Sequence, residues 1–254
     1  MKSSFSALCA TAALAAALPC SAGAAAAYVA ASFDRNSLVF LDEDMTPVST
    51  FPVADAFPNA VSSNGTLIFA AYFTDASVVA YDFDGVEQFR WSNPGLYRVQ
   101  GIALIDSYLA AASGETLYLF DARSGAYAAQ LTLGMDGVEG LAYDGHYLWS
   151  IGSRLVARDF DTGTAVRSVP NAASACPQGG TGIATVAPGT LMLACSDGRW
   201  FRVSDADGSV IASGRNEIDM FDVARLAPVP EPGTAAFALA GLGALAGLGR
   251  RRKR

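Results

Sequence analysis

Few residues in this chain of 254 residues have the type and spacing that chemistry requires. The sequence contains one histidine, His146, which follows Asp144 and Gly145 at an expected hairpin turn. A catalytic histidine needs a nucleophile and an orienting acid within reach, and the chain has no G-x-S-x-G motif to present a serine. We therefore interpret His146 as an exposed turn residue, assign no catalytic residue, and predict that the protein is not an enzyme.

Cofactor and metal chemistry also lack the necessary pattern. The glycine-rich stretch 178–182 contains no lysine and leads into an expected strand, which disfavours phosphate binding. With one histidine and no C-x-x-C pair, we predict no metal site and no cofactor. The Asp-rich turns 82–85, 159–161 and 205–208 lack the later bidentate glutamate of an EF-hand. Capping of the turns by aspartate is favoured, and calcium binding is the alternative.

Composition excludes two further classes of protein. Between Tyr28 and Val229 the chain has 23 acidic residues and 11 arginines, a net charge of −12. Such a chain has no cationic surface to displace counterions from phosphates, so nucleic acid is excluded as a partner. The same stretch is rich in valine, leucine, isoleucine and aromatic residues, which excludes a disordered chain.

The two ends of the chain have the pattern of targeting segments. Residues 1–27 combine Lys2, an apolar run and small residues around Ala24, as in a signal peptide that signal peptidase removes. The C-terminal residues 229–254 contain an uncharged stretch, 234–249, whose 16 residues would rise about 24 Å as a short transmembrane helix. It is preceded by Val229, Pro230, Glu231 and Pro232 and followed by the basic cluster Arg250, Arg251, Arg252, Lys253 and Arg254. The positive-inside rule keeps that cluster in the cytoplasm and the middle of the chain outside.

This three-part tail resembles the PEP-CTERM sorting signal of Gram-negative bacteria. The resemblance implies that exosortase, a membrane protease-transpeptidase, recognises and processes the tail. It also implies a protein that is anchored in the inner membrane by its C-terminal helix and then released to the envelope, cell surface or extracellular matrix. The setting that the resemblance implies is exopolysaccharide production and biofilm formation. A plain single-pass membrane anchor is the alternative.

Two cysteines remain after the signal region. Cys9 and Cys20 lie within residues 1–27, which leaves Cys176 and Cys195 in the exported part of the chain. Two remaining cysteines in an exported protein usually pair. We therefore predict a disulfide between Cys176 and Cys195.

The central part of the chain, residues 28–228, repeats with a period of about 40 residues. A motif of polar, small, aliphatic and small residues recurs at intervals of 41, 39, 42 and 40 residues. Its copies begin at Asn59, Gln100, Glu139, Thr181 and Phe221. Turn signals such as Asn64-Gly65 and further strands follow the first four copies. Each unit therefore predicts four antiparallel strands, the size of one blade of a β-propeller.

The ends of this repeat predict a closed ring. Residues 28–32 match the second strand of a blade, whereas residues 221–226 match an innermost strand that no blade follows. Joining the two gives an all-β, five-bladed propeller closed by its C-terminal strand, and an open solenoid is the alternative. The D-x-x-[ST]-G turns resemble those of the YVTN, NHL and quinoprotein-like propeller repeats.

A ligand site is predicted at the start of the innermost strands. Asn59, Gln100, Glu139 and Thr181 are polar, and we expect them to ring the mouth of the central channel. One acid among them favours a neutral polar ligand, a sugar, over an anion, while channel waters are the alternative. Trp91 and Tyr97, between the second and third blades, are candidates to stack on the same ligand. For Trp91, packing between blades is the alternative.

These patterns predict an exported, non-enzymatic propeller that binds or scaffolds a polysaccharide or other matrix ligand. A carbohydrate-active enzyme is the alternative, and it would need paired carboxylates at the cavity. Only Glu139 falls at the polar position that begins the repeated motif. A structural spacer is the third option.

Overall fold

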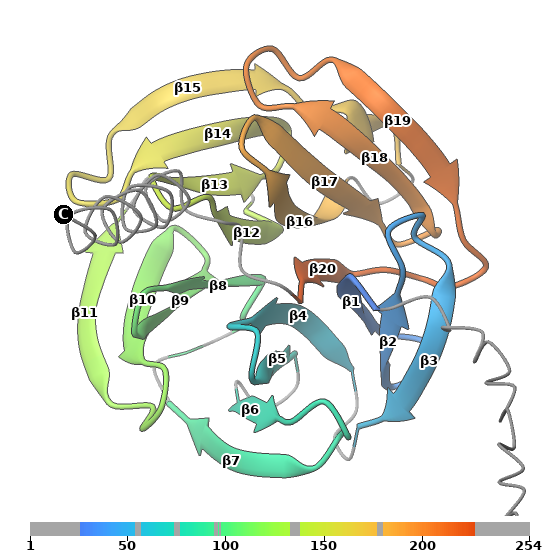
Figure 1. The fold of residues 1–254 in the computed structure, drawn as a ribbon. Helices are drawn as coiled ribbons and strands as arrows, with labels where there is room; N and C mark the ends of the chain where they lie inside the picture. The colour runs from blue at the N-terminus through green and yellow to red at the C-terminus, as the bar shows by residue number, and fades with distance from the viewer. Residues whose placement is uncertain are drawn as a thin grey trace, which may run out of the picture.

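The computed structural model describes residues 26–53, 57–73, 77–93, 96, 98–132, 138–176 and 180–226. These residues form twenty β-strands in five four-stranded antiparallel sheets around a central axis (Figure 1). The predicted all-β five-bladed propeller is therefore confirmed. The predicted signal peptide, apart from its last two residues, and the predicted sorting signal lie outside the described residues. Within the described residues, no helix has the length and apolar character that crossing a membrane would need.

The strands of each blade follow one another from the axis outward. Blade 1 contains β20 (Asp222–Arg225), β1 (Tyr28–Ser32), β2 (Ser37–Leu41) and β3 (Pro47–Pro52). Blade 2 contains β4 (Pro58–Ser63), β5 (Ile68–Tyr72), β6 (Ser77–Tyr81) and β7 (Glu87–Ser92). Blade 3 contains β8 (Gly101–Ile105), β9 (Tyr108–Ser113), β10 (Thr116–Asp121) and β11 (Tyr127–Thr132). Blade 4 contains β12 (Gly140–Tyr143), β13 (Tyr147–Ile151), β14 (Arg154–Asp159) and β15 (Ala165–Pro170). Blade 5 contains β16 (Gly180–Ala187), β17 (Thr190–Cys195), β18 (Arg199–Ser204) and β19 (Val210–Arg215), and a 3₁₀ helix, η1 (Ala172–Ala175), precedes it.

Blade 1 closes the ring as the repeat predicted. The C-terminal strand β20 pairs antiparallel with β1, with Arg225 opposite Tyr28 and Asp222 opposite Ala31. The amide of Leu226 donates a hydrogen bond to the carbonyl of Ala27 at 2.9 Å, so the pairing extends past Arg225. Both ends of the described chain therefore lie together, at the end of the axis where β20 finishes.

Burial decreases from the axis to the rim of the propeller. The second and third strands of a blade pack against neighbouring blades on both faces, so their sequences are almost continuously apolar, as in Ser37–Leu41 and Ser77–Tyr81. The outermost strands pack on one side only and carry exposed residues along most of their length, as in Ala165–Pro170. The hydrophobic core is consequently divided among the contacts between neighbouring blades.

The Asp-rich turns between the outer strands are held by their own side chains. Asp82 Oδ1 accepts hydrogen bonds from the amides of Asp84 and Val86, and Asp159 Oδ1 accepts from the amide and hydroxyl of Thr162. Asp207 Oδ1 accepts from Ser209 in the same way. These contacts are the capping role that the sequence favoured over calcium binding.

Candidate functional site: the axis of the propeller

The innermost strands begin so close to one another that their backbones touch. A Cβ atom at Gly101 would lie 2.6 Å from Cα of Gly140, and one at Gly182 would lie 2.6 Å from Cα of Asp222. A side chain at either glycine would overlap the neighbouring backbone, because real Cβ contacts are longer than 3 Å. Where the second residue of the motif is glycine, no larger residue fits, and the channel is closed at this level.

Asp222 occupies the closed part of the axis. It is the second residue of the fifth motif copy, and it is fully buried. Its Oδ2 accepts a hydrogen bond from the amide of Val61 at 2.9 Å, and its Oδ1 accepts from Ile183 at 3.3 Å and Val223 at 2.9 Å. Alternate amides of an edge strand point away from its partner strand, here toward the axis. One carboxyl group thus joins blades 5, 1 and 2.

Asp222 was not among the site residues predicted from the sequence, where it stood out only as a carboxylate one residue after the polar position of the motif. Its signal was its position: the other four copies of the motif have Ala60, Gly101, Gly140 and Gly182 there. A carboxyl group at a position where the other copies have glycine or alanine indicates a side chain that fills the space left by those small residues.

Burial of Asp222 has a consequence for stability against pH. Burial raises the pKa of its carboxyl group well above the ordinary value of 3.8, although three amide hydrogen bonds act in the opposite direction. Because its pKa is higher in the folded than in the unfolded state, the Asp222 carboxyl group contributes its full stabilisation below about pH 4. That contribution is lost as the pH rises through the folded-state pKa. We expect the free energy of unfolding of wild type to decrease with pH in that window. Urea unfolding at several pH values, compared with Asp222→Asn, measures this slope, and an equal slope in the variant would contradict the assignment.

Other carboxyl groups also affect how the free energy of unfolding depends on pH. Burial also raises the pKa of Glu139, which therefore adds to the same decrease. Hydrogen bonds from Ser124 and Thr162 lower the pKa values of Asp121 and Asp159, whose effect is an increase of stability with pH at more acidic values. Asp121 and Asp159 act at lower pH than Asp222 and Glu139. The slope of the unfolding free energy above about pH 4 therefore reports Asp222 and Glu139.

Beyond Asp222 the axis widens into a cavity of about 280 Å³. Its inner walls are the aliphatic third residues of the motif, such as Ile102 and Leu141, whereas its rim is polar. The polar rim residues are Ser63, Asn64, Asp106, Asp144, Thr185 and Arg225. They lie where the innermost strands end and turn, which is the end opposite to the one that the sequence analysis expected. The axial cavity thus opens at the other end from the expected channel mouth, because the glycine contacts close the axis where the strands begin.

The charged groups of the rim are held in place by neighbours. The guanidinium of Arg225 donates to Tyr28 Oη and to Glu43 Oε1, each at 2.7 Å. The hydrogen bond from Arg225 holds the pKa of Glu43 below its ordinary value. On the opposite side, Asp144 accepts hydrogen bonds from two turn amides and from the indole of Trp149 at 2.7 Å. Asp144 thus serves the fold and is not a free acid or base.

The polar residues predicted to ring the channel mouth are turned mainly toward neighbouring backbone. Three of these side chains make hydrogen bonds to main-chain atoms at 2.7, 3.3 and 3.1 Å: Asn59 to Val99, Gln100 from Gly114, and Thr181 to Met220. Glu139 is half-buried beside them. None of the four lines the axial cavity. Their contact with a ligand stays a prediction.

Trp91 lies between blades 2 and 3. It is 9% exposed, its ring is 4.6 Å from that of Phe120, and it covers Gly125 in the next blade. The structure therefore favours the packing alternative over stacking on a ligand. Tyr97, the other predicted stacking residue, lies outside the described residues. His146 is exposed at its turn, where its amide donates to Asp144.

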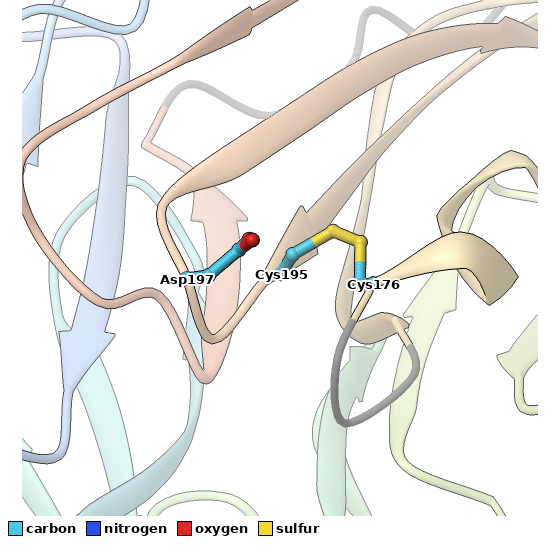
Figure 2. Close-up of side chains that lie close together, drawn as sticks. All are labelled: Cys176, Cys195 and Asp197. Carbon is cyan, nitrogen blue, oxygen red and sulfur yellow. A yellow bond between two sulfur atoms is a disulfide. The ribbon is translucent and has the colours of Figure 1, made fainter.

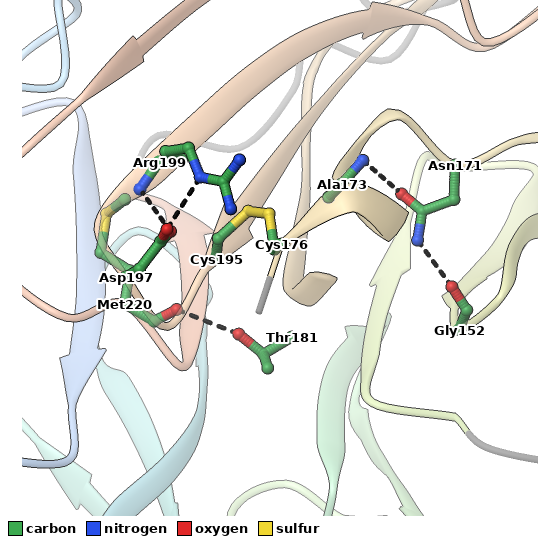
Figure 3. Close-up of a disulfide and its surroundings, with 9 residues drawn as sticks. All are labelled: Gly152, Asn171, Ala173, Cys176, Thr181, Cys195, Asp197, Arg199 and Met220. Carbon is green, nitrogen blue, oxygen red and sulfur yellow. Dashed lines mark hydrogen bonds and ion pairs between the residues drawn. A yellow bond between two sulfur atoms is a disulfide. The ribbon is translucent and has the colours of Figure 1, made fainter. Parts of the chain in front are cut away.

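Cys176 and Cys195 form a disulfide that attaches the segment after η1 to β17. Asp197 lies beside it (Figure 2), where its carboxylate accepts hydrogen bonds from Nε and the amide of Arg199 (Figure 3). Both sulfur atoms are bonded to each other, so they present no thiolates to a metal ion.

Reduction of this disulfide should lower the stability of the protein. The two cysteines are 19 residues apart, and a loop of that length corresponds to about 3 kcal/mol in the chain-entropy model. We expect Cys176→Ser/Cys195→Ser to lose about this free energy of unfolding relative to oxidised wild type. Titration of thiols in the unreduced exported protein checks the pairing, and two free thiols would contradict it.

Fold and site together define a five-bladed β-propeller with a plugged axis and a polar-rimmed cavity. Residues 228–253 match the PEP-CTERM protein-sorting motif. The match confirms the sorting signal, and it implies an exported protein of a Gram-negative bacterium that is membrane-anchored for sorting and processed by exosortase. Its motif residues Val229, Pro230, Glu231 and Pro232 and the basic cluster 250–254 lie outside the described residues. No curated protein matches this chain.

Several solved structures share the fold at low sequence identity. Glutaminyl cyclase of Myxococcus xanthus is 16% identical, with a TM-score of 0.58 over 76% of this chain and 87% of that one. A protein of unknown function from Bacteroides caccae is 12% identical, with a TM-score of 0.50 over 75% and 73%. U3-55K is 11% identical, with a TM-score of 0.50 over 75% of this chain, which spans 61% of that protein. At these identities the likeness extends to the fold alone.

Proposed function

We propose that this protein is a non-enzymatic binding module of the cell envelope or extracellular matrix, where its propeller binds polysaccharide. The observation that carries the proposal is the pairing of an exosortase sorting motif with a closed propeller that keeps an axial cavity. A rigid ring with a concave site is a suitable binding element for a protein that is delivered outside the cell.

The cavity supports a small polar ligand. Its volume of about 280 Å³ is at the lower end of the range for ligand pockets, which suits a single sugar residue. Aliphatic walls can contact the carbon face of a sugar, and the rim includes Asn64, whose amide NH2 can donate to a sugar hydroxyl. The Thr185 hydroxyl donates to the carbonyl of Tyr143 at 3.2 Å, and its oxygen can accept a hydrogen bond from the ligand. The rim contains Arg225 together with Asp106 and Asp144, so charges of both signs lie around the cavity and neither an anion nor a cation is favoured all round.

Binding without hydrolysis is favoured by the state of the rim acids. Glycoside hydrolysis needs two carboxyl groups that flank the scissile bond. Asp144 accepts three hydrogen bonds from its own blade, which leaves Asp106 as the other carboxyl group of the cavity lining. We therefore place the protein among binding modules rather than glycoside hydrolases.

Processing of both ends is expected on the way to the matrix. The mature protein should lack Lys2 and the basic cluster 250–254, because signal peptidase cuts after one of residues 24–27 and exosortase removes the other end. Intact-mass measurement of the secreted or envelope-bound protein gives the two boundaries. A mature protein that keeps the basic cluster, in a strain that makes exosortase, would contradict the proposed route.

The binding role is tested with the processed full-length protein. We expect affinity gel electrophoresis to show retardation by at least one neutral polysaccharide among hydroxyethyl cellulose, xylan and galactomannan. Reducing-sugar release from the same polymers should equal that of a no-protein control. Retardation by none of the polymers would contradict the binding role, and release of sugar would replace it with the enzyme alternative.

A further inference from the structure

Four phenylalanine rings gather at the end of the axis opposite to the cavity. Phe33 stacks on Phe57 with ring centroids 4.5 Å apart and on Phe221 at 4.8 Å, and it meets the edge of Phe73 at 6.5 Å. They follow β1 and β5 or precede β4 and β20, so they come from blades 1 and 2. We call these four residues the phenylalanine platform.

The backbone around the platform is held in an unusual conformation. Phe57 and Arg98 have φ angles of +67° and +55°, in the left-handed region that bulky side chains rarely adopt. The amide of Phe57 donates to Asn36 Oδ1 at 2.9 Å, and its carbonyl accepts from the amide of Phe73 at 3.2 Å. Such strain persists only where surrounding contacts enforce it, and it is concentrated at functional sites.

The platform is exposed and has a polar neighbourhood. Phe57 and Phe73 are 36% and 37% exposed, whereas Phe69 and Phe120 of the core are buried. The guanidinium of Arg98 lies 5.3 Å from the ring centroid of Phe73. Phe221 begins the fifth copy of the motif whose other copies begin with Asn59 and Gln100, so polar side chains continue around the axis from the platform.

The exposed area of the two rings is small compared with a protein–protein interface. A phenylalanine buries roughly 150–250 Å² when covered, so the exposed parts of Phe57 and Phe73 amount to about 100–200 Å² together. A stable protein–protein interface needs about 800 Å² on each side. The platform therefore suits one or two flat rings rather than a second copy of this chain. Both ends of the described chain leave from the opposite end of the axis, next to the pairing of Arg225 with Tyr28.

We propose that the phenylalanine platform is a sugar-binding site, on which a neutral pyranose residue of a polysaccharide stacks against Phe57 and Phe73. This inference rests on the proposed binding function and locates its main contact outside the cavity. A pyranose has an apolar C–H face for the rings and a rim of hydroxyls for the side chain of Arg98. The net charge of −12 between residues 28 and 229 disfavours an acidic polymer at the same surface.

The test compares matched variants of the processed full-length protein by affinity gel electrophoresis in hydroxyethyl cellulose, xylan, galactomannan and alginate. Phe57→Leu/Phe73→Leu keeps apolar side chains but removes the flat ring faces. Phe83→Leu is the control, because Phe83 is 39% exposed and lies at the turn before β7, away from the platform. Thr185→Val removes a hydroxyl from the cavity instead. Circular dichroism establishes that each variant is folded.

We expect the double variant to bind the retarding neutral polymer about tenfold or more weakly, since two aromatic contacts are lost. Phe83→Leu should stay within about twofold of wild type, and alginate should not retard the protein. Thr185→Val should weaken binding less than the double variant does. Full binding by the double variant would overturn the platform and leave the binding function intact. Binding lost in Thr185→Val alone would assign the ligand to the cavity. A wild type that no neutral polymer retards would overturn the binding function and the platform together.

Discussion

Asp222→Ala should lower the free energy of unfolding by about 3–5 kcal/mol. The substitution leaves the amides of Val61, Ile183 and Val223 without their acceptor at the axis. Each buried donor that loses its partner costs about 1–3 kcal/mol. Relief of the buried carboxylate and entry of water from the adjoining cavity offset part of the sum. The expected loss is still a large fraction of the 5–15 kcal/mol that stabilises a typical domain.

Chemical denaturation of wild type and variant measures this loss directly. Asp44→Ala is the matched control, because Asp44 is an exposed carboxylate on blade 1 and should change stability by less than about 0.5 kcal/mol. If Asp222→Ala is too unstable to purify, Asp222→Asn keeps one acceptor oxygen and allows the comparison. A variant as stable as Asp44→Ala would show that the carboxyl group does not hold the blades together.

Trp91→Ala should destabilise the protein by about 3–5 kcal/mol, the usual cost of removing a buried aromatic side chain. The indole fills the contact between blades 2 and 3, where it packs on Phe120 and leaves no room for a side chain at Gly125. Because the role is packing, the folded fraction of the variant should bind polysaccharide as wild type does.

Trp91→Phe tests the packing role of Trp91 with an aromatic side chain of smaller volume. The indole N–H of Trp91 has no hydrogen-bond partner among the described residues. Phenylalanine therefore removes little besides volume, and we expect it to recover most of the stability that alanine loses. Denaturation midpoints of the two variants, measured together with their binding, make the comparison. Loss of binding with unchanged stability would return Trp91 to the ligand site.

The architecture could be predicted because it is encoded locally and repeatedly. The turns are set by residues such as Asn64 and Asp159, whose side chains hydrogen-bond to amides within three residues of their own position. The closure of the ring followed from the register of residues 28–32 and 221–226. These two segments form β1 and β20, whose pairing is the one the repeat required.

The site could not be predicted in the same way, because it depends on how five equivalent strands meet at the axis. The sequence shows Gly101, Gly140 and Gly182 at equivalent positions, but not that their backbones approach closely enough to close the channel. The phenylalanine platform is assembled from Phe33 and Phe221, which are far apart in the chain and belong to different copies of the repeat. Nor could the sequence show that Trp91 is buried whereas Phe57 is exposed.

The strand that closes the ring is also the strand to which the C-terminal tail is attached. Any mechanical load that an anchored tail transmits therefore acts first on the four-residue strand β20 and its pairing with β1. The load enters at Leu226, whose amide is bonded to the carbonyl of Ala27, so it separates the two strands one residue pair at a time from that end. Asp222 is at the far end of β20, where its carboxyl group is hydrogen-bonded to blades 2 and 5. The propeller thus resists tension most strongly at the last contact that a pull on the tail would reach.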